Sequence, residues 1–311
     1  FDHPGFILFS SGTTGAPKCI VHSAGGVLLK DLVEQRLHLD IRPGDRISYF
    51  TTCGWMMWNW LVMSLGTGAT IVLFDGNPMT PTNDRLLRLV RDEELTFLGV
   101  SAKYIESLRE RNVSATDTMV TSLRTLASTG SPLAPELFDF VYDNISTSVH
   151  VASISGGTDI CGCFVLGLPN EPVHRGEIQA AALGMDVRVL DDEGRELPRG
   201  ERGELVCATP FPSRPLGFWG DDGTRMHQAY FARFPEVWAH GDFISRTANG
   251  GFVIHGRSDA TLNSRGVRIG TAEIYRVVDA MSTVRESLAV AQRWELDTRI
   301  LLFVVLDDGA T

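Results

Sequence analysis

The chain has 311 residues, of which 43% are hydrophobic and 21% charged, and its formal net charge is -10. This balance is ordinary for a globular protein and argues against a disordered chain. The acidic charge argues against a general nucleic-acid binder, which needs a basic face, although a few N–H groups and basic side chains can still hold phosphates locally. No run approaches the ~18 apolar residues of a membrane span.

The cysteines are few and odd in number, which fits reduced thiols in a cytoplasmic protein. They are Cys19, Cys53, Cys161, Cys163 and Cys207. Cys161 and Cys163 lack the C-x-x-C spacing of a zinc site, so buried thiols are the simpler interpretation. Residues 1–5 do not form a signal peptide and resemble the middle of a protein, so we expect both ends to be truncated.

Short apolar runs alternate with amphipathic stretches over the first 160 residues. The expected strands are 6–10, 46–51, 70–74, 95–98, 123–127 and 149–154. The expected helices are 27–37, 56–65, 84–93, 102–111 and 135–142. This βαβα order predicts an α/β fold with a mostly parallel sheet covered by helices.

The pattern changes after residue 158. Residues 174–208 contain short strands divided by turns, which predicts a smaller β-rich subdomain. From about residue 256 the pattern predicts an α+β unit that is too short to be a domain alone. Its expected elements are a strand at 267–269, a helix at 271–281 and strands at 287–292 and 300–306. We predict an α/β core at 1–170, the β-rich subdomain at 171–258 and the incomplete start of a C-terminal domain at 259–311.

The strongest local signal is the loop that follows the first strand. It reads Ser10, Ser11, Gly12, Thr13, Thr14, Gly15, Ala16, Pro17 and Lys18. The glycines let the backbone turn tightly and approach an anion, the hydroxyl and N–H groups can donate to phosphate oxygens, and Lys18 adds a point charge. The spacing fits neither a Walker A motif nor a dinucleotide-binding loop. The alternative is an ordinary Ser/Gly-rich surface loop.

This string is similar to the signature phosphate loop of the adenylate-forming superfamily, which includes acyl-CoA synthetases. Members activate a carboxylate with ATP, release pyrophosphate and hold an acyl-AMP. The resemblance therefore implies a nucleotide-binding core in residues 1–170, with Lys18 acting on the phosphates of ATP.

A second segment, Ser155-Gly156-Gly157-Thr158-Asp159, follows a strand and resembles the Y-G-x-T-E element of the same superfamily. The resemblance implies that Thr158 contacts the phosphates and that Asp159 assists Mg²⁺, which prefers carboxylate and phosphate oxygens. Ser155 replaces the aromatic residue, and Asp159 replaces a longer glutamate, which draws the carboxylate back from the metal. A simple glycine turn after the strand is the alternative.

Two further segments resemble the parts of the superfamily that hold adenosine. Gly130, Ser131 and Pro132 match the segment that lines the adenine, although a turn before the helix at Pro135 is an alternative. Asp242, in His240-Gly241-Asp242, would accept hydrogen bonds from both ribose hydroxyls. Arg257 would also contact the ribose, with an exposed ion pair as the alternative.

The segment from residue 256 to residue 274 resembles the hinge and the start of the mobile C-terminal domain of the superfamily. Asp259 would be the hinge residue, Arg268 would face phosphate, and Gly266 would leave room for the pantetheine arm of CoA. The domain would swing between adenylation and thioester formation.

An aromatic segment at 51–60 is expected to border the acyl pocket, unless its tryptophans only pack the core. The candidate pocket residues are Trp55, Asn59, Ser155, Gly156 and Gly157. Acetyl-CoA synthetases carry tryptophan at the position of Gly156, so the glycine implies room for a longer acyl group. Asn59 or Ser155 could bind the ketone of acetoacetate.

Several strings, including Gly54-Trp55-Met56-Met57-Trp58-Asn59, resemble acetoacetyl-CoA synthetases more specifically. The implied reaction converts acetoacetate, ATP and CoA to acetoacetyl-CoA, AMP and pyrophosphate, with Mg²⁺ as cofactor. No protein partner can be read from the sequence. The alternatives are another short-chain acid, such as acetate, propionate or butyrate, and a non-catalytic nucleotide-binding remnant. The superfamily carries a lysine near its C-terminus, whereas the last lysine here is Lys103, so we expect this chain alone to lack full adenylation activity.

Overall fold

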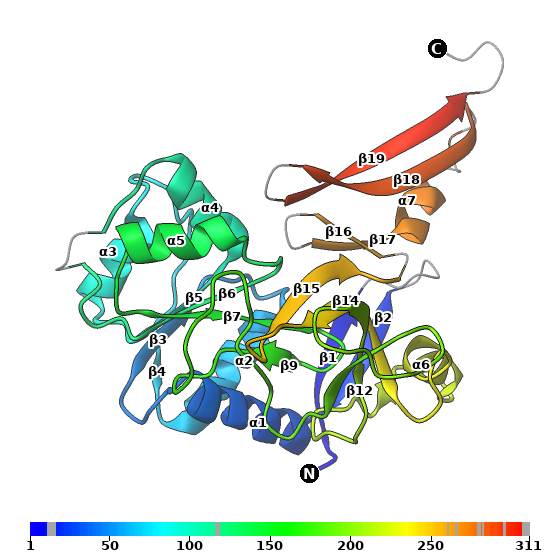
Figure 1. Ribbon diagram of the computed structural model, residues 1–311, viewed down its shortest axis with the longest axis horizontal. Helices are drawn as coiled ribbons and strands as arrows, with labels where there is room; N and C mark the ends of the chain where they lie inside the picture. The colour runs from blue at the N-terminus through cyan, green and yellow to red at the C-terminus, as the bar shows by residue number, and fades with distance from the viewer. Residues whose placement is uncertain are drawn as a thin grey trace.

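The computed structural model describes residues 1–10, 17–115, 119–259, 261–264, 267–278, 281, 283–294 and 297–306. A five-stranded parallel sheet forms the centre of its first half (Figure 1). The strand order is β4 (Thr70–Ile71), β3 (Arg46–Tyr49), β5 (Phe97–Ser101), β6 (Thr125–Thr129) and β7 (His150–Ser153). The prediction of an α/β fold with a parallel sheet is confirmed.

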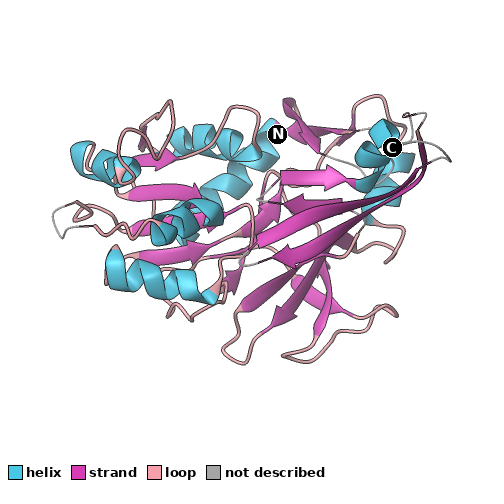
Figure 2. Cartoon of the chain, turned by 90° about the horizontal axis from the view of Figure 1, so that it is seen from above, coloured by secondary structure: helices cyan, strands magenta, loops and turns pink. Residues whose placement is uncertain are grey.

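Helices cover both faces of this sheet (Figure 2). They are α1 (Ala24–Val33), α2 (Met56–Met63), α3 (Arg85–Asp92), α4 (Ala102–Glu110) and α5 (Pro135–Asn144). The helix α1 continues into the π-helical turn η1 (Glu34–His38), and α2 continues into the 3₁₀ turn η2 (Ser64–Thr67). The side chain of Ser101 accepts a hydrogen bond from the N–H of Tyr104 and so caps α4.

The sheet separates two hydrophobic cores because successive side chains of a strand point to opposite faces. On β5, Phe97 enters the core that holds α2, and Leu98 enters the core that holds α3, α4 and α5. On β6, Leu126 and Ala127 divide in the same way. Near-continuous burial on both faces is typical of parallel strands.

The first strand lies outside the parallel sheet. The strand β1 (Pro4–Ser10) pairs antiparallel with β2 (Lys18–Ser23), and β2 pairs with β13 (Gly217–Phe218). A parallel crossover needs a dozen or more residues, and only seven positions separate Ser10 from Lys18. The loop expected to bind phosphate is therefore the connection of a hairpin, and its residue Lys18 begins a strand that the sequence pattern did not reveal.

Residues 155–257 are rich in antiparallel strands. One sheet has the order β10 (Ala180–Ala181), β9 (Gly162–Leu166) and β8 (Ser155–Gly157). The other has the order β11 (Val187–Leu190), β12 (Arg202–Cys207), β14 (Trp238–Arg246) and β15 (Phe252–Arg257). The short helix α6 (Thr224–Tyr230) packs near β13 and β14.

Two hairpins and a helix follow β15 (Figure 1). The hairpins are β16 (Thr261–Ser264) with β17 (Val267–Gly270) and β18 (Val284–Trp294) with β19 (Asp297–Leu306), and α7 (Thr271–Val278) lies between them in sequence. The division into three domains given above stays a prediction. None of the helices in the described ranges is both long and apolar enough to cross a membrane.

Candidate active site

A cavity of about 320 Å³ opens where the parallel sheet meets β8, β14 and β15. The last residues of four parallel strands line it: Tyr49, Ser101, Thr129 and Ser153. Ligands of open α/β sheets bind at this carboxyl edge, because the loops that leave the strands can present donors there. The topology alone therefore marks the cavity as the candidate site.

Most of the described candidate residues line this cavity, although they come from six separate segments. They are Ser10, Trp55, Gly130, Ser131, Pro132, Ser155, Gly156, Gly157, Thr158, Asp242 and Arg257. Four described candidates are not among its lining residues: Lys18, Asn59, Asp159 and Asp259. Asn59 is half-buried on α2, so Ser155 is better placed than Asn59 to contact a ligand in the cavity.

Some candidates lie outside the described residues. They are Ser11, Gly12, Thr13, Thr14, Gly15 and Gly266. The backbone of Arg268 pairs with Asn263 in the hairpin of β16 and β17. On either side of this loop, Ser10 and Lys18 face each other across the β1–β2 hairpin, and Ser10 lines the cavity.

Lys18 and Asp159 form an ion pair beside the cavity. The ammonium of Lys18 lies 2.8 Å from Oδ1 of Asp159, and the hydroxyl of Tyr230 donates to the same oxygen at 2.5 Å. Lys18 also donates to the Tyr230 hydroxyl at 3.3 Å. The side chain of Lys18 is 19% exposed and that of Asp159 only 4%. Sequence reasoning missed Tyr230, because a lone tyrosine at the end of a short polar helix gives no signal.

His22 supports the neighbouring Thr158. Its Nε2 lies 2.9 Å from the carbonyl oxygen of Thr158. Burial lowers the pKa of His22 to about 4, although the Thr158 carbonyl and Asp159 act in the opposite sense. The ring is therefore neutral at pH 7 and donates its Nε2–H to that carbonyl, which anchors the segment from β8 on strand β2.

Asp242 and Arg257 are cross-strand neighbours on β14 and β15 and form an ion pair at the cavity wall. Arg257 Nη1 donates to Asp242 Oδ1 at 3.2 Å, and its Nε donates to Asp259 Oδ1 at 3.1 Å. Burial disfavours the charge of Arg257, but Asp242 and Asp259 outweigh it and raise the pKa of Arg257. The predicted ribose contacts and the predicted hinge residue thus share one hydrogen-bonded group.

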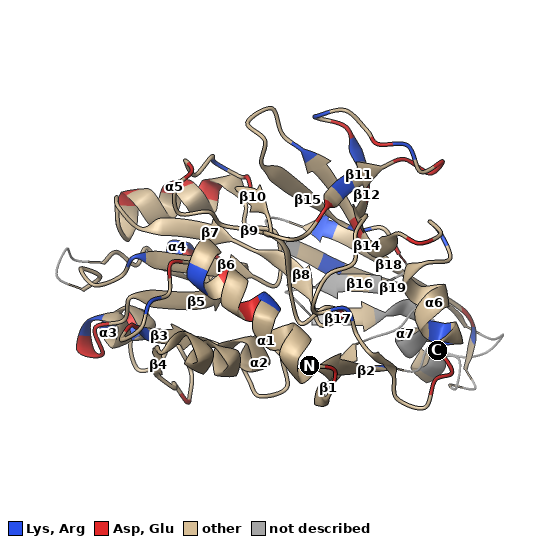
Figure 3. Ribbon diagram, turned by 90° about the horizontal axis from the view of Figure 1, so that it is seen from below, with Lys and Arg blue, Asp and Glu red and all other residues tan. Residues whose placement is uncertain are grey.

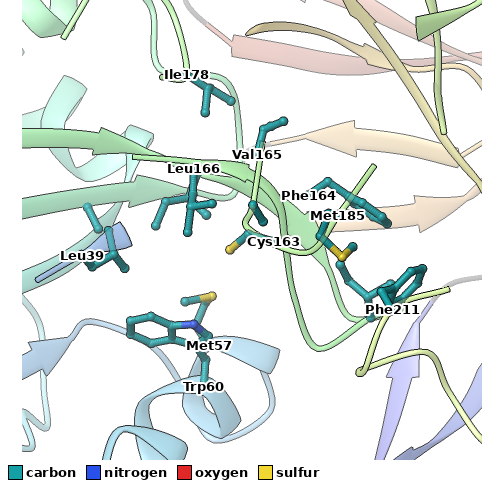
Figure 4. Packing of buried hydrophobic residues seen from close by; sticks show 14 of the residues in the cluster. Leu39, Met57, Trp60, Cys163, Phe164, Val165, Leu166, Ile178, Met185 and Phe211 are labelled. Carbon is teal, nitrogen blue, oxygen red and sulfur yellow. The ribbon is translucent and has the colours of Figure 1, made fainter. Parts of the chain in front are cut away.

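Part of the cavity wall is apolar, and a buried ion pair is hydrogen-bonded to it. Met57 and Cys163 belong to this part, and Figure 4 shows both close to Trp60. Behind them, Glu34 accepts hydrogen bonds from the N–H of Cys163 at 2.7 Å and from Nε1 of Trp60 at 2.9 Å. Lys30 pairs with Glu34 and donates to the carbonyl of Cys163 at 2.9 Å. The pair therefore fixes both backbone polar groups of Cys163.

Gly156 has a backbone reason as well as the expected pocket reason. A Cβ added at Gly156 would lie 2.0 Å from the carbonyl oxygen of Gly162 on the adjacent strand β9. The missing side chain thus points at a neighbouring strand, and the glycine lets β8 and β9 approach closely. Room for a longer acyl group is at most a consequence of this packing.

The charged and titratable groups of the described residues limit the chemistry that the cavity can perform. Basic and acidic residues are interspersed along the described elements (Figure 3). Burial raises the pKa of the Cys161 and Cys163 thiols well above the ordinary value, so these thiols are protonated and inert at pH 7. The chemistry of the cavity therefore rests on hydroxyls, backbone groups and the two ion pairs, Lys18–Asp159 and Arg257–Asp242.

Comparisons with known proteins agree with this geometry. The acetoacetyl-coenzyme A synthetase of Rhizobium meliloti (strain 1021) is 57% identical over 311 residues, which is 99% of this chain and 48% of that protein. The acetoacetyl-CoA synthetase of Mus musculus is 48% identical over 100% of this chain and 47% of its own length. The solved structure of acetoacetyl-CoA synthetase from Streptomyces lividans superimposes with a TM-score of 0.79 at 45% identity, covering 100% of this chain and 48% of that one.

The chain thus spans about half the length of the curated relatives it matches. A family model described as "AMP-binding enzyme" matches residues 2–215, the part that contains the phosphate loop, the parallel sheet and most of the cavity wall. The chain belongs to the family of AMP-binding enzymes.

Proposed function

We propose that this chain is the nucleotide-binding part of an acid–CoA ligase that converts acetoacetate, ATP and CoA to acetoacetyl-CoA, AMP and pyrophosphate through an acyl-adenylate. The observation that carries the proposal is one cavity lined by residues of six resembling segments, among them Ser10, Gly130, Thr158 and Asp242. Similarity to three acetoacetyl-CoA synthetases supports the acyl substrate.

The proposed nucleotide contacts follow the cavity wall. Gly130, Ser131 and Pro132 leave the end of β6 and would border the adenine. Asp242 would accept hydrogen bonds from the ribose hydroxyls while Arg257 holds its carboxylate in place. Ser10 and Lys18 flank the loop that would hold the phosphates, and the carbonyl of Thr158 is held by His22. Binding in this way aligns the α-phosphate with a carboxylate and stabilises the leaving pyrophosphate.

The residues present fit a magnesium ion that is held largely by its substrate. No group of three or more His, Cys, Asp or Glu side chains in the described part could hold a metal ion. Mg²⁺ commonly takes one or two carboxylates and completes its shell with waters and substrate phosphates. Asp159 would supply such a carboxylate: its side chain is buried, and it is paired with the ammonium of Lys18 in this structure. When bound, the ion would neutralise the charge that develops on the phosphates.

CoA and the hinge belong to the last part of the chain. We propose that Asp259 is the hinge residue and that Gly266 and Arg268 serve the pantetheine arm and the phosphates when the following domain swings. Support comes from the contact of Asp259 with Arg257, because it joins the expected hinge to the expected ribose site. With about half the length of its relatives, this chain alone would perform adenylation poorly.

For the acyl group, we propose that the space near Trp55, Ser155, Gly156 and Gly157 receives acetoacetate, with Met57 and Cys163 also in the cavity wall. Ser155 would donate to the ketone oxygen. The alternative is another short-chain acid, such as propionate, butyrate or acetate. A cytoplasmic location, as expected from five unpaired cysteines, goes with this proposal.

The test is acid-dependent exchange of pyrophosphate into ATP, measured with a protein that carries this chain together with the remaining length of its relatives. We expect kcat/KM to be at least about tenfold higher with acetoacetate than with acetate, propionate or butyrate, since one good polar contact contributes ~1.4 kcal/mol or more. Equal rates with all four acids would remove the substrate proposal and keep the ligase. Absence of exchange with every acid would remove the ligase.

A further inference from the structure

The hydroxyl of Tyr230 contacts both members of the Lys18–Asp159 ion pair, beside the proposed phosphate site. It donates to Oδ1 of Asp159 at 2.5 Å and accepts from the ammonium of Lys18 at 3.3 Å. Tyr230 ends helix α6 and is 2% exposed. It reaches this point from 71 residues after Asp159 and 212 residues after Lys18, so the fold, and no local motif, assembles the group.

Aromatic packing fixes the position of this hydroxyl. The Tyr230 ring stacks on Trp238 with a centroid distance of 3.8 Å and an interplanar angle of 14°. A second ring, Phe218, meets it edge-on with a centroid distance of 5.9 Å. A ring held by stacked and edge-on neighbours cannot follow a moving partner, so the carboxylate of Asp159 is anchored to a rigid donor.

Lys18 is the partner that is free to leave. Its side chain is 19% exposed, against 4% for Asp159, and it begins strand β2 opposite Ser10, which lines the cavity. If the ammonium turns to nucleotide phosphates, the buried carboxylate of Asp159 loses its counter-charge, which is costly unless another cation takes that place. The Tyr230 hydrogen bond remains in either arrangement.

We propose that Tyr230 is a positioning residue: it holds the carboxylate of Asp159 toward a divalent cation while Lys18 gives up that carboxylate to reach the nucleotide phosphates. The proposal rests on the proposed nucleotide site and is independent of which acid is activated. It also gives a physical role to the short side chain of Asp159, because a carboxylate fixed by a rigid hydroxyl keeps its position without the longer arm of glutamate.

The test compares Tyr230→Phe with the matched control Tyr104→Phe. Phenylalanine at position 230 keeps the ring on Trp238 and removes only the hydroxyl. Tyr104 is also a buried tyrosine, but its hydroxyl has no hydrogen-bond partner in the described structure and lies in the other core. Isothermal titration of each chain with ATP is carried out once with Mg²⁺ and once with EDTA, and again in an Asp159→Asn background.

We expect Tyr230→Phe to weaken binding of ATP with Mg²⁺ about tenfold, or ~1.4 kcal/mol, and to change binding without Mg²⁺ less than twofold. In the Asp159→Asn background the same substitution should change binding with Mg²⁺ less than twofold. Tyr104→Phe should leave both affinities unchanged. A Tyr230→Phe chain that binds with Mg²⁺ like the unmodified chain, or an equal loss with and without Mg²⁺, overturns the proposal.

Thermal unfolding without nucleotide gives a second, independent measurement. Tyr230→Phe should lower the Tm of the unmodified chain more than it lowers the Tm of Asp159→Asn, because the two side chains interact. Equal decreases in both backgrounds would mean that the hydroxyl does not hold the carboxylate, which also overturns the proposal. Neither measurement contains an acid, so a failed acetoacetate assay would leave both results standing.

Discussion

Two lysine–carboxylate pairs lie close to residues of the cavity wall, and they differ in access to solvent. Lys30 and Glu34 have side chains 2% and 0% exposed, whereas Lys18 and Asp159 are 19% and 4% exposed. Glu34 is also bonded to Cys163 and Trp60, so one pair joins helix α1 to strand β9 and helix α2. The Lys30–Glu34 pair holds the wall of the site together. In the Lys18–Asp159 pair, the ammonium can leave the carboxylate, and another cation can take its place.

The comparison shows that a lysine–carboxylate pair can stabilise the fold or remain available to a ligand, depending on how far solvent reaches it. The Lys30–Glu34 pair, here called the sealed pair, is stable only while both charges and their hydrogen bonds are present. Neither charge can be hydrated if the other is removed. Asp31, beside this pair, shows the same cost of an isolated buried charge: burial raises the pKa of its carboxyl well above the ordinary value, and Glu34 raises it further. In the Lys18–Asp159 pair the ammonium is partly exposed and can turn to a ligand, while the Tyr230 hydroxyl still donates to the buried carboxylate.

The largest effect is expected from a substitution that breaks the sealed pair. Lys30→Met should lower the free energy of unfolding by ~3–5 kcal/mol, because it leaves the Glu34 carboxylate buried without a counter-charge. Lys18→Met should cost less, ~1–2 kcal/mol, because the Lys18 ammonium is partly exposed and Asp159 keeps the hydrogen bond from the Tyr230 hydroxyl. Urea unfolding of both variants measures the contrast. The double variant Lys30→Met with Glu34→Gln should recover much of the loss, and similar costs for the two single variants would contradict the comparison.

The next effect concerns the strands that the sealed pair supports. Gly156→Ala should cost ~1–3 kcal/mol of unfolding free energy, since its Cβ would lie 2.0 Å from the carbonyl oxygen of Gly162 and a backbone shift is required. Gly54→Ala is the matched control, because Gly54 also lines the cavity but its Cβ would meet nothing closer than 3.9 Å. Equal stabilities of the two alanine variants would show that β8 and β9 separate without cost.

The sequence predicted the architecture well because it is encoded by local repetition. The runs at 95–98 and 123–127 and the amphipathic stretches at 102–111 and 135–142 correspond to β5, β6, α4 and α5 within a few residues. The strand expected at 70–74 is reduced to Thr70–Ile71, and β2 was not predicted. Hairpin pairing depends on a partner strand, which a local pattern does not specify.

The site was predictable only where a motif is contiguous. Gly130 to Pro132 and Ser155 to Thr158 were found from their strings, and both line the cavity. By contrast, Lys30 and Glu34 lie on a helix where charged residues ordinarily indicate a solvated face, and their partner Cys163 is 129 residues away. Contacts over such separations arise from packing and leave no periodic signal. The roles of the individual site residues stay predictions.

A smaller effect sharpens the functional side of the comparison. Asp242→Asn should weaken AMP binding about tenfold, because an amide accepts more weakly than a carboxylate and loses the charge that holds Arg257. Isothermal titration measures it, with Asp139→Asn on the exposed face of α5 as the control. An unchanged affinity for AMP in Asp242→Asn would argue that the ribose lies elsewhere in the cavity.

The smallest effect is a pH dependence in the sealed region. His38 donates Nδ1–H to the carbonyl of Gly167 at 2.8 Å and accepts at Nε2 from the N–H of Leu183 at 3.0 Å, which requires a neutral ring. Burial lowers the pKa of His38 below its ordinary value of 6.5, although the Gly167 carbonyl opposes the shift. Because the folded pKa is the lower one, the unfolded chain takes up the proton first as the pH falls. The stability from neutral His38 is therefore complete above pH 6.5 and is lost as the pH falls below it.

His38→Gln tests this sign, because glutamine can donate and accept but does not titrate. The unmodified chain should be more stable than His38→Gln by ~1 kcal/mol at pH 7.5, the size of one hydrogen bond, and this advantage should shrink toward pH 5.5. Urea unfolding at several pH values measures the difference, in which the shared contributions of the other titrating groups cancel. A constant difference between the two chains would mean that His38 keeps the same pKa in the folded and unfolded states. The region around His38 and the Lys30–Glu34 pair would then be open to water in the folded chain. The contrast between this pair and the Lys18–Asp159 pair would then have no structural basis.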